Sequence, residues 1–556
     1  MQTETKAEGV RLENLDLDNR EKARDAQEVE ILRLGAEVTL LEGRSPWRVL
    51  FENPKVVLLI LIVQFNSVVV GMEYSLPGNV LGINAFLKLF GVPTGTGSYN
   101  VPAGTLTLWA AMFALFQMFG QAFGGWQSDY FGRRFCLYSV VFWTYLGVTL
   151  EIISQNWRMW TGAKIVIGFA TGVMQSVVPT YVAEVAPREC RAINLGLCHL
   201  TAVFGALIST LVTYGTNTKW GANIDDQRAF RVPLYIGLAV PTLCAFFELF
   251  ILVESPWWLL MKGKREQARK SLEYLYSWQK SVDIDAKFAE LEYTLRKEAE
   301  AKELQKQSSY LECFKGVDLR RSFVAAFPQA SSNLAGNNLN GQYATYFFQI
   351  AGSENPLVNS VVTIVVGMAS NVIAFFFIED KRIGRRPLLL FGIITMTLCM
   401  LGIAITAEVT NGVYTHAGGV LLTLFVALFA TANSIGPGVA GYAYVGESGS
   451  SRLRAKTTTL GVLGAATIGL IMTSALPWML NARSAGGQGW GVKTAWMFVV
   501  LGTISSVVTW LWIPEYAGRT YAQIDELFIR KVPTRKFKSF ECSGEYGRDL
   551  DMTVPQ

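Results

Sequence analysis

The sequence GWQSDYFGRR, at residues 125–134, lies between two long apolar runs, and its glycine and paired arginines return in KRIGRR at residues 381–386. A second pair of sequences repeats in the same way. EVAPRECR at 184–191 and ESGSSRLR at 447–454 each place a glutamate seven residues before an arginine, and each follows the glycine and arginine motif of its own half. The chain therefore contains an internal duplication, and duplicated charged clusters between apolar segments are typical of transporters.

The composition indicates a membrane protein. Hydrophobic residues make up 51% of the chain and charged residues 17%, and the mean hydropathy is +0.29. The apolar residues come in long blocks, so most of the chain is predicted to lie within the bilayer. We expect no cleaved signal peptide, because no basic start followed by a short apolar core opens the sequence. The seven cysteines fall in predicted spans or cytoplasmic segments, which leaves none for an extracellular disulfide.

Apolar windows of about 20 residues predict twelve membrane helices in two sets of six. The fold class expected is thus an all-α membrane protein with a cytoplasmic helical insert between its halves. The windows lie near 55–76, 105–128, 135–155, 160–182, 192–215, 232–253, 322–348, 356–378, 387–407, 418–441, 457–480 and 494–513. The expected domains are an N-terminal tail at 1–50, a six-helix bundle at 51–261, a helical linker at 262–321, a second six-helix bundle at 322–513 and a C-terminal tail at 514–556.

The positions of lysine and arginine predict the orientation, because cytoplasmic loops retain positive charge during insertion. The arginine-rich motifs of both halves and the whole of 262–321 fall on one side of the predicted spans. Both termini and the linker are therefore expected in the cytoplasm of a plasma-membrane protein. Residues 1–45, which are charged and poor in aromatic side chains, are expected to form a disordered tail.

Ionisable residues inside the spans are the strongest functional candidates, since a charge at mid-bilayer costs ~2.5–3.5 kcal/mol. Glu73 lies deep in the first span and is predicted to bind a proton, although a position at the extracellular mouth would also explain it. Lys164 in the fourth span is its candidate charge partner, unless its side chain extends to the membrane surface. Glu151 and Glu248 are expected to have structural roles near span ends or against neighbouring helices.

The seventh span carries an unusual number of amide and hydroxyl side chains. Asn333 and Asn337 share one helical face. Amides both donate and accept hydrogen bonds, which suits hydroxyl-rich ligands, whereas hydrogen bonding between helices is the alternative. Gly336 and Gly341 are expected to let this span bend. His199 in the fifth span is a candidate for substrate contact or for a bond between helices.

The motifs together resemble those of the sugar porter branch of the major facilitator superfamily, and more closely those of fungal alpha-glucoside (maltose-type) permeases. The resemblance extends from about residue 50 to residue 537. Its motifs are the loop at 125–134, PTYVAE with its proline and arginine at 179–191, ESPWWL at 254–259, PWMLN at 477–481 and the sequences PEYAGRT and IDELF at 514–528.

The resemblance implies roles for particular residues. Glu73 falls where family symporters have a proton-coupling aspartate, and Lys164 stands where an arginine often pairs with it. His199 takes the place of a sugar-binding glutamine, and Tyr442 lies in the segment where a tryptophan packs on the sugar ring. Ala465 falls about where an asparagine is often found. The expected substrate-binding residues are His199, Gln175, Asn333, Asn337, Asn338, Tyr343 and Tyr442.

The charged motifs are expected to form a cytoplasmic gate. Because these charged residues share a cytoplasmic placement, we expect their charge pairs to hold the outward-open state and to break on inward opening. The expected gating residues are Gly125, Asp129, Gly132, Arg133, Arg134, Glu184, Arg191 and Glu254 in the first half, and Gly384, Arg385, Glu447 and Arg454 in the second.

The expected function is proton-coupled symport of a sugar, an alpha-glucoside, another disaccharide or a hexose, by alternating access. The expected partners are this small-molecule substrate and the lipid bilayer, with no nucleic acid, no obligate protein partner, no metal and no cofactor besides the coupling proton. The alternatives are a carrier of the same fold for a polyol, an organic acid or a secondary metabolite, and a nutrient receptor without flux. An enzyme is not expected, because the sequence has neither a GxxxxGK[ST] phosphate loop nor a metal-spaced histidine and cysteine cluster.

Overall fold

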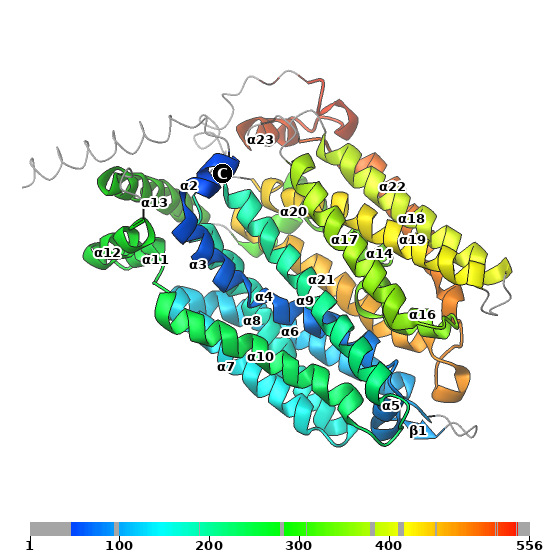
Figure 1. Ribbon diagram of the computed structural model, residues 1–556. Helices are drawn as coiled ribbons and strands as arrows, with labels where there is room; N and C mark the ends of the chain where they lie inside the picture. Colours follow the sequence, from blue (N-terminus) through cyan, green and yellow to red (C-terminus); the bar gives the residue numbers. More distant parts are fainter. Residues whose placement is uncertain are drawn as a thin grey trace, which may run out of the picture.

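A computed structural model of the chain describes residues 46–93, 99–187, 190–278, 283–306, 309–378, 384–409, 416–450, 453–516, 519, 521–540 and 542. These residues form two helical bundles that lie side by side with their long helices running in similar directions (Figure 1). Eleven helices of the described residues are long and apolar enough to cross a membrane. The expected disordered tail lies outside the described residues.

The N-terminal bundle contains six spans, the first of which is interrupted. The break falls at Phe65–Asn66, between α3 and α4. A short helix precedes the first span, and a short helix with an antiparallel two-stranded hairpin follows it. The elements are α2 (Pro46–Glu52), α3 (Pro54–Gln64), α4 (Ser67–Val80), α5 (Asn84–Phe90), β1 (Val92–Pro93), β2 (Tyr99–Asn100), α6 (Ala103–Phe131), α7 (Arg133–Ile153), α8 (Trp157–Val185), α9 (Arg191–Trp220) and α10 (Arg228–Ile251).

The C-terminal bundle supplies the other spans. Its first span is divided into three helices, α14, α15 and α16. α14 is too polar and the other two are too short to be among the eleven long apolar helices. The elements are α14 (Gly316–Leu334), α15 (Asn337–Gln342), α16 (Ala344–Ile350), α17 (Pro356–Ile378), α18 (Arg385–Val409), α19 (His416–Ile435), α20 (Pro437–Glu447), α21 (Arg454–Leu480), η3 (Arg483–Ala485), η4 (Gly491–Thr494) and α22 (Ala495–Trp512). The expected all-α fold with two membrane bundles is confirmed.

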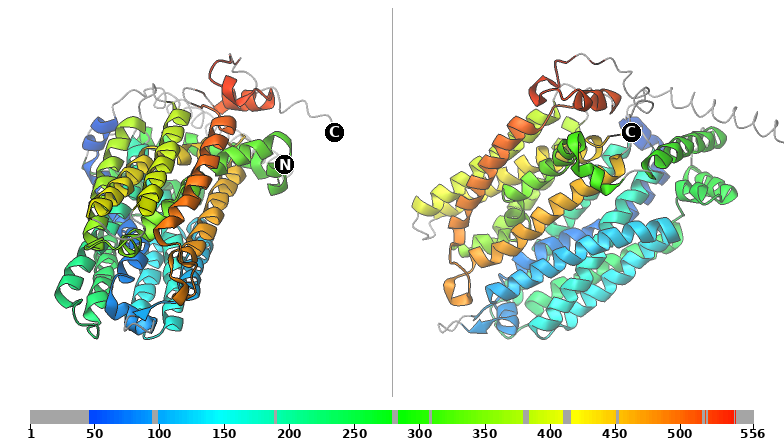
Figure 2. Two further views of the ribbon diagram at one scale, coloured as in Figure 1. Left: turned by 90° about the vertical axis from the view of Figure 1, so that its right-hand side faces the viewer. Right: turned by 180° about the vertical axis from the view of Figure 1, so that it is seen from behind.

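Each bundle carries helical segments at one end. Leu272 and Leu275 of α12 pack into the apolar core of the N-terminal bundle, and Lys55 donates to the carbonyl of Tyr274 at 2.6 Å. On the C-terminal bundle, Phe528 of α23 is buried and Arg321 pairs with Asp525. These elements lie at the same end of the molecule, and we call it the linker end (Figure 2). They are α11 (Pro256–Met261), α12 (Arg265–Leu275), α13 (Ile284–Lys306), η2 (Tyr310–Phe314), α23 (Tyr521–Ile529) and η5 (Thr534–Lys536).

Glycines allow α4 to lie close against α9. A Cβ atom at Gly205 would stand 1.9 Å from the carbonyl oxygen of Val68, and one at Gly71 would stand 1.6 Å from that of Ala202. Small residues at membrane helix contacts permit such close approach. This contact sets the rotation of α4, and therefore the direction in which Glu73, two residues after Gly71, points.

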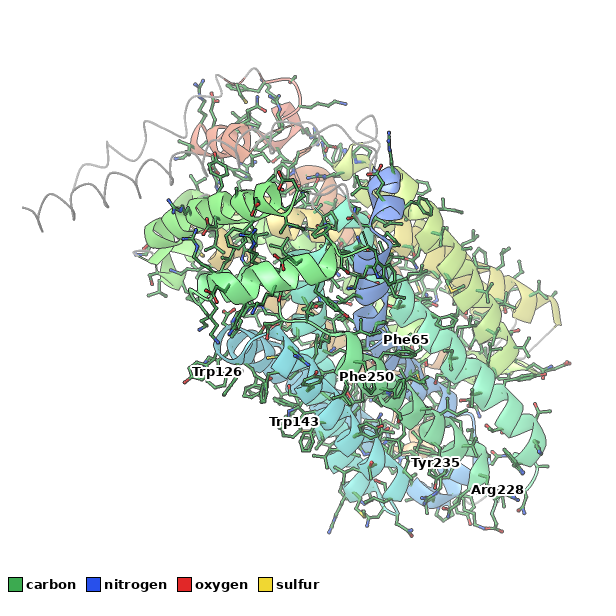
Figure 3. The ribbon with its side chains drawn as sticks, turned by 60° about the vertical axis from the view of Figure 1, so that its left-hand side comes forward. Phe65, Trp126, Trp143, Arg228, Tyr235 and Phe250 are labelled. Carbon is green, nitrogen blue, oxygen red and sulfur yellow. The ribbon has the colours of Figure 1, made fainter. Side chains whose placement is uncertain are left out.

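The outer surface of the N-terminal bundle is aromatic. Trp126 of α6, Tyr235 of α10 and Phe250 of α10 are 58%, 52% and 74% exposed. Figure 3 shows their side chains on the outside of the bundle. Trp126 and Phe250 lie near the linker end, whereas Tyr235 lies near the other end of its helix. Exposed aromatic side chains near both ends of membrane helices suit the two interfaces of a bilayer.

The two bundles meet at the end that carries α5 and the β1–β2 hairpin, which we call the hairpin end. Thr345 of α16 donates to Asn79 of α4 at 2.8 Å, and Thr107 of α6 donates to the carbonyl of Ser474 at 3.0 Å. Asn481 also donates to the carbonyl of Val101 at 3.1 Å. These bonds join one bundle to the other, so the structure has its hairpin end closed.

Candidate functional site

A buried lysine contacts two carboxylates in the N-terminal bundle. Lys164 of α8 donates to Glu73 of α4 at 3.0 Å, and its Nζ atom lies 2.6 Å from Oε1 of Glu151 on α7. Glu73, Lys164 and Glu151 are 5%, 4% and 1% exposed. The sequence predicted the pair of Glu73 and Lys164, and the structure places the two side chains at hydrogen-bonding distance. It also places Glu151 on the same lysine, whereas the sequence suggested only a structural role near a span end.

A cavity opens beside this pair and is lined from both bundles. About 40 Å³ of it admits the centre of a water molecule, which is room for a few waters. Its walls are mainly aromatic, and Lys164 lies 5.3 Å from the ring centroid of Trp160. Its lining residues include Glu73, Phe86, Trp109, Phe113, Trp160 and Lys164 from the N-terminal bundle, with Gln342 and Tyr343 from the C-terminal bundle.

The first span of the C-terminal bundle breaks several residues before Gln342 and Tyr343, which line this cavity. α14 ends at Leu334, and Gly336 has φ of 107°, a left-handed conformation that glycine adopts without strain. A Cβ atom there would also lie 2.7 Å from Cε of Met400. The expectation that Gly336 lets the span bend agrees with this geometry. The break turns α15 toward α4, where a Cβ atom at Gly78 would meet the carbonyl of Gln342 at 2.7 Å.

The amides of this broken span connect it to neighbouring helices. Asn333 donates to the carbonyl of Ala465 at 3.2 Å, and Asn338 donates to that of Gly469 at 3.1 Å, both on α21. Ser332 donates to Asn433 at 2.9 Å. The two asparagines therefore make bonds between helices in this conformation. Both remain half-buried, as does Asn337, while Tyr343 is buried and faces the cavity.

A second polar cluster lies in the N-terminal bundle. Gln175 of α8 accepts hydrogen bonds from Gln117 at 3.0 Å and from Gln121 at 2.8 Å, both on α6. Gln117 also donates to the Tyr74 hydroxyl at 2.6 Å. Of this amide cluster (Tyr74, Gln117, Gln121 and Gln175), only Gln175 was expected from the sequence. The spacing of Gln117 and Gln121, one turn apart on α6, was the available signal.

The structure gives less information on two other expected substrate-binding residues, His199 and Tyr442. His199 lies on α9 and is exposed, whereas Lys164, Glu73 and Glu151 are buried. Tyr442 belongs to α20, but its side chain lies outside the described part of the structure.

The charged motif of the first half forms a compact cluster at the linker end. Arg133 contacts Glu184 at 2.7 Å and Asp129 at 3.4 Å. Glu254 accepts from the backbone N–H of Arg133 at 2.8 Å, and this carboxylate occupies the space beside Gly132, where a Cβ atom would lie 2.5 Å from it. Gly132 has φ of 96°, so glycine satisfies both the turn and the close contact.

The second half repeats this arrangement. Arg385 pairs with Glu447, and its backbone N–H donates to Glu515 at 3.0 Å. Glu515 lies beside Gly384 as Glu254 lies beside Gly132. The sequence contained Glu515 within a family motif but gave no indication of this contact. The remaining gating candidates are Gly125, Arg134, Arg191 and Arg454. A Cβ atom at Gly125 would lie 3.7 Å from Ser176, and the backbone N–H of Arg134 donates to Glu254 at 3.3 Å. Arg191 is half-buried, and the side chain of Arg454 lies outside the described residues.

The expected action of these charge pairs needs correction. Each pair given above joins elements of the same bundle, and each is formed while the hairpin end is closed. When two rigid bundles rock against each other, contacts within a bundle do not change. The pairs therefore stiffen each bundle, and a latch between the bundles would have to consist of other contacts.

Comparisons with known proteins agree with this architecture. The model of the family described as sugar (and other) transporters matches residues 59–528. The general alpha-glucoside permease of Saccharomyces cerevisiae is 27% identical over 502 residues, which cover 88% of this chain and 78% of the permease. The maltose permease MAL61 of the same yeast is 27% identical over 87% of this chain and 78% of its own.

Solved structures share the fold. The inward-open conformation of the xylose transporter XylE from E. coli superimposes with a TM-score of 0.69 at 17% identity, over 85% of this chain and 99% of XylE. These relatives are permeases and transporters, so a multi-pass membrane transporter is confirmed and an enzyme is not indicated. The chain belongs to the family of sugar (and other) transporters.

Proposed function

We propose that this protein is a proton-coupled sugar symporter that works by alternating access. The observation that carries the proposal is the Glu73–Lys164 pair, which is buried beside a cavity lined from both bundles. An ionisable pair in a membrane interior is costly, and such groups therefore usually mark sites of transport or coupling. The yeast relatives named alpha-glucoside and maltose permeases, and a structural relative described as a proton:xylose symporter, support this function.

The sugar class follows from the side chains available between the bundles. The amide cluster on α4, α6 and α8 offers several donors and acceptors, and the asparagines of α14 and α15 offer more from the other bundle. Such groups match sugar hydroxyls, each of which donates and accepts. The aromatic walls of the cavity suit the apolar faces of sugar rings. We favour an alpha-glucoside or a hexose as the substrate.

The distribution of basic residues supports an orientation with the hairpin end outside the cell. Arginine and lysine are concentrated at the linker end, in the motifs of both halves and in α12 and α13. By the positive-inside rule this end and both termini lie in the cytoplasm of a plasma-membrane protein. Gln342 and Tyr343 then separate the proton site from the outside in the closed conformation.

Coupling follows from the charge of the site. Protonation of Glu73 from the outside weakens its bond to Lys164. The protein can then pass through the closed state with the proton and the sugar bound. When the linker end opens, the cytoplasm takes the proton and the pair forms again. A membrane potential adds ~2.3 kcal/mol per charge per 100 mV, which is enough to accumulate a neutral sugar.

The test is alkalinisation of a weakly buffered suspension of cells that lack their own sugar carriers and express this protein. Addition of maltose, glucose or another sugar should raise the external pH in step with labelled uptake. Glu73→Gln should abolish the pH change while sugar exchange at equal concentrations continues. Uptake without any pH change in the unmodified protein would exclude proton symport.

The same cells identify the substrate class. Labelled maltose, glucose, a polyol and an organic acid are offered separately at equal concentration. The amide cluster predicts uptake of a sugar, and competition by unlabelled sugars should reduce it. Uptake of the organic acid alone would contradict the proposed substrate class, and absence of any flux at normal surface expression would favour a receptor.

A further inference from the structure

Glu151 gives the proton site a second carboxylate. Its Oε1 atom lies 2.6 Å from Lys164 Nζ, nearer than the 3.0 Å of Glu73, and the side chain has no exposed surface. Both carboxylates thus contact the same ammonium group. Three groups from α4, α7 and α8 therefore form one cluster, and they carry two acids for one base.

The charge of this cluster is not balanced when all three groups are ionised. Two carboxylates and one ammonium leave a net charge of −1 in a membrane interior. A net charge in a membrane interior is less favourable than a neutral cluster, because the excess charge has no counter-charge. One proton on either carboxylate makes the cluster neutral. A lysine with Glu73 alone would already be neutral, and would gain a net charge of +1 on binding a proton.

The other charged groups on the packed elements lie elsewhere. Arg231 of α10 donates to the backbone carbonyls of Ile152 and Ser154, at the end of α7, and Glu248 of α10 accepts from Asn66 at 2.6 Å near the break in the first span. Asp129 of α6 and Glu184 of α8 belong to the linker-end cluster. Arg158, at the start of α8, is exposed. Among the described contacts, Lys164 is therefore the cation that faces the two carboxylates.

We infer that Glu73 and Glu151 hold one coupling proton between them around Lys164, so that Glu151 is a second coupling residue and not only a structural one. This inference rests on the proposed function. A proton from the extracellular water converts two carboxylates into one carboxylate and one carboxylic acid. The same proton later leaves to the cytoplasmic water, and both carboxylates are restored. Glu73 lines the cavity and exchanges the proton, while Glu151 provides the negative charge that makes proton binding favourable.

This arrangement predicts an unusual result for Glu151→Gln. The remaining Lys164 and Glu73 form a neutral pair that has no need of a proton, so sugar movement should become independent of protons. Substrate-induced alkalinisation should fall about tenfold or more, because the neutral pair binds a proton only by gaining a net charge inside the membrane. Sugar exchange at equal concentrations on both sides should continue, because it does not require net proton flux. Glu151→Asp should restore part of the pH change.

The experiment compares five proteins at equal surface expression: the unmodified chain, Glu151→Gln, Glu73→Gln, Glu151→Asp and Glu248→Gln. The last is a matched control, because Glu248 is also buried but contacts an amide and not Lys164. Coupling should be lost in the first two variants and kept in the control. If the unmodified protein shows no alkalinisation, the proposed function fails. If the unmodified protein shows alkalinisation and Glu151→Gln keeps both alkalinisation and uphill accumulation of sugar, the shared proton site is wrong. Loss of exchange together with coupling in both Glu151 variants would show a structural role instead.

Discussion

At the scale of single residues, Gln175 is the centre of the amide cluster, because it accepts from two glutamines of α6 at 3.0 and 2.8 Å. Gln175→Ala removes a side chain that we expect to bind sugar hydroxyls. Gln121 then loses this acceptor, and Gln117 keeps only its bond to the Tyr74 hydroxyl. Loss of one such interaction is worth about 1.4 kcal/mol, so the apparent KM for sugar should rise about tenfold. Initial rates of labelled uptake over a range of sugar concentrations measure this change.

Gln127→Ala is the matched control for that variant. Gln127 is a buried glutamine of the same helix as Gln117, and it accepts a bond from Ser139 on α7, away from the cluster. Its replacement should leave the KM unchanged. An unaltered KM in Gln175→Ala, with normal expression, would place the sugar outside the amide cluster.

Residue types predicted part of this site but not its partners. Glu73 and Lys164 stood out because charges are rare inside spans, and that argument needs only the sequence. The contact between Glu151 and Lys164 depends on how α7 is rotated against α8, which hydropathy does not specify. Glu515 is similar, because its place beside Gly384 arises from two segments that are 131 residues apart in sequence.

At the scale of elements, the contact of α4 with α9 contains the two glycines of the described structure that leave the least space for a Cβ atom, Gly71 and Gly205. Gly205→Ala would push a methyl group to 1.9 Å from the carbonyl of Val68, so the helices must separate. Overpacking of this kind typically costs about 1–3 kcal/mol. The purified protein should lose several degrees of thermal stability, and transport should fall because α4 carries Glu73. Gly215→Ala, on the same helix with open space around it, should change neither property.

The melting temperatures of the two variants, measured in the same detergent, test this prediction. Equal melting temperatures for Gly205→Ala and Gly215→Ala would contradict the close packing of α4 and α9. A loss of transport without a loss of stability in Gly205→Ala would instead locate the effect in the movement of α4.

Most element boundaries could be predicted, because a span of about 20 apolar residues is visible in the sequence. The breaks within spans could not. The first span divides at Phe65–Asn66, where the amide of Asn66 bonds to Glu248 on another helix. α14 begins at Gly316, inside the segment expected to be a linker, because the polar start of this helix packs against the C-terminal segment through Arg321 and Asp525. Such tertiary contacts leave no periodic signal.

At the scale of the whole molecule, the duplication has a structural meaning beyond the repeated motif. Gly132 with Glu254 and Gly384 with Glu515 form the same contact in the two bundles, as do Arg133 with Glu184 and Arg385 with Glu447. Each bundle is thus stiffened at its own linker end by a similar charge cluster. Stiff bundles favour motion at the interface between them, which alternating access requires.

That motion must break the contacts that close the hairpin end. The side chains of Asn79 and Thr345 meet there at 2.8 Å, one from each bundle. In a protein with Asn79→Cys and Thr345→Cys, a short bifunctional thiol reagent should join the bundles and reduce sugar uptake about tenfold or more, since a population held in one state cannot complete the cycle. Each single variant and the unmodified protein, with its native cysteines, should keep most of their uptake after the same treatment. A cleavable reagent allows recovery of uptake on reduction to be measured. Normal uptake in a fully cross-linked double variant would show that the hairpin end does not open during transport.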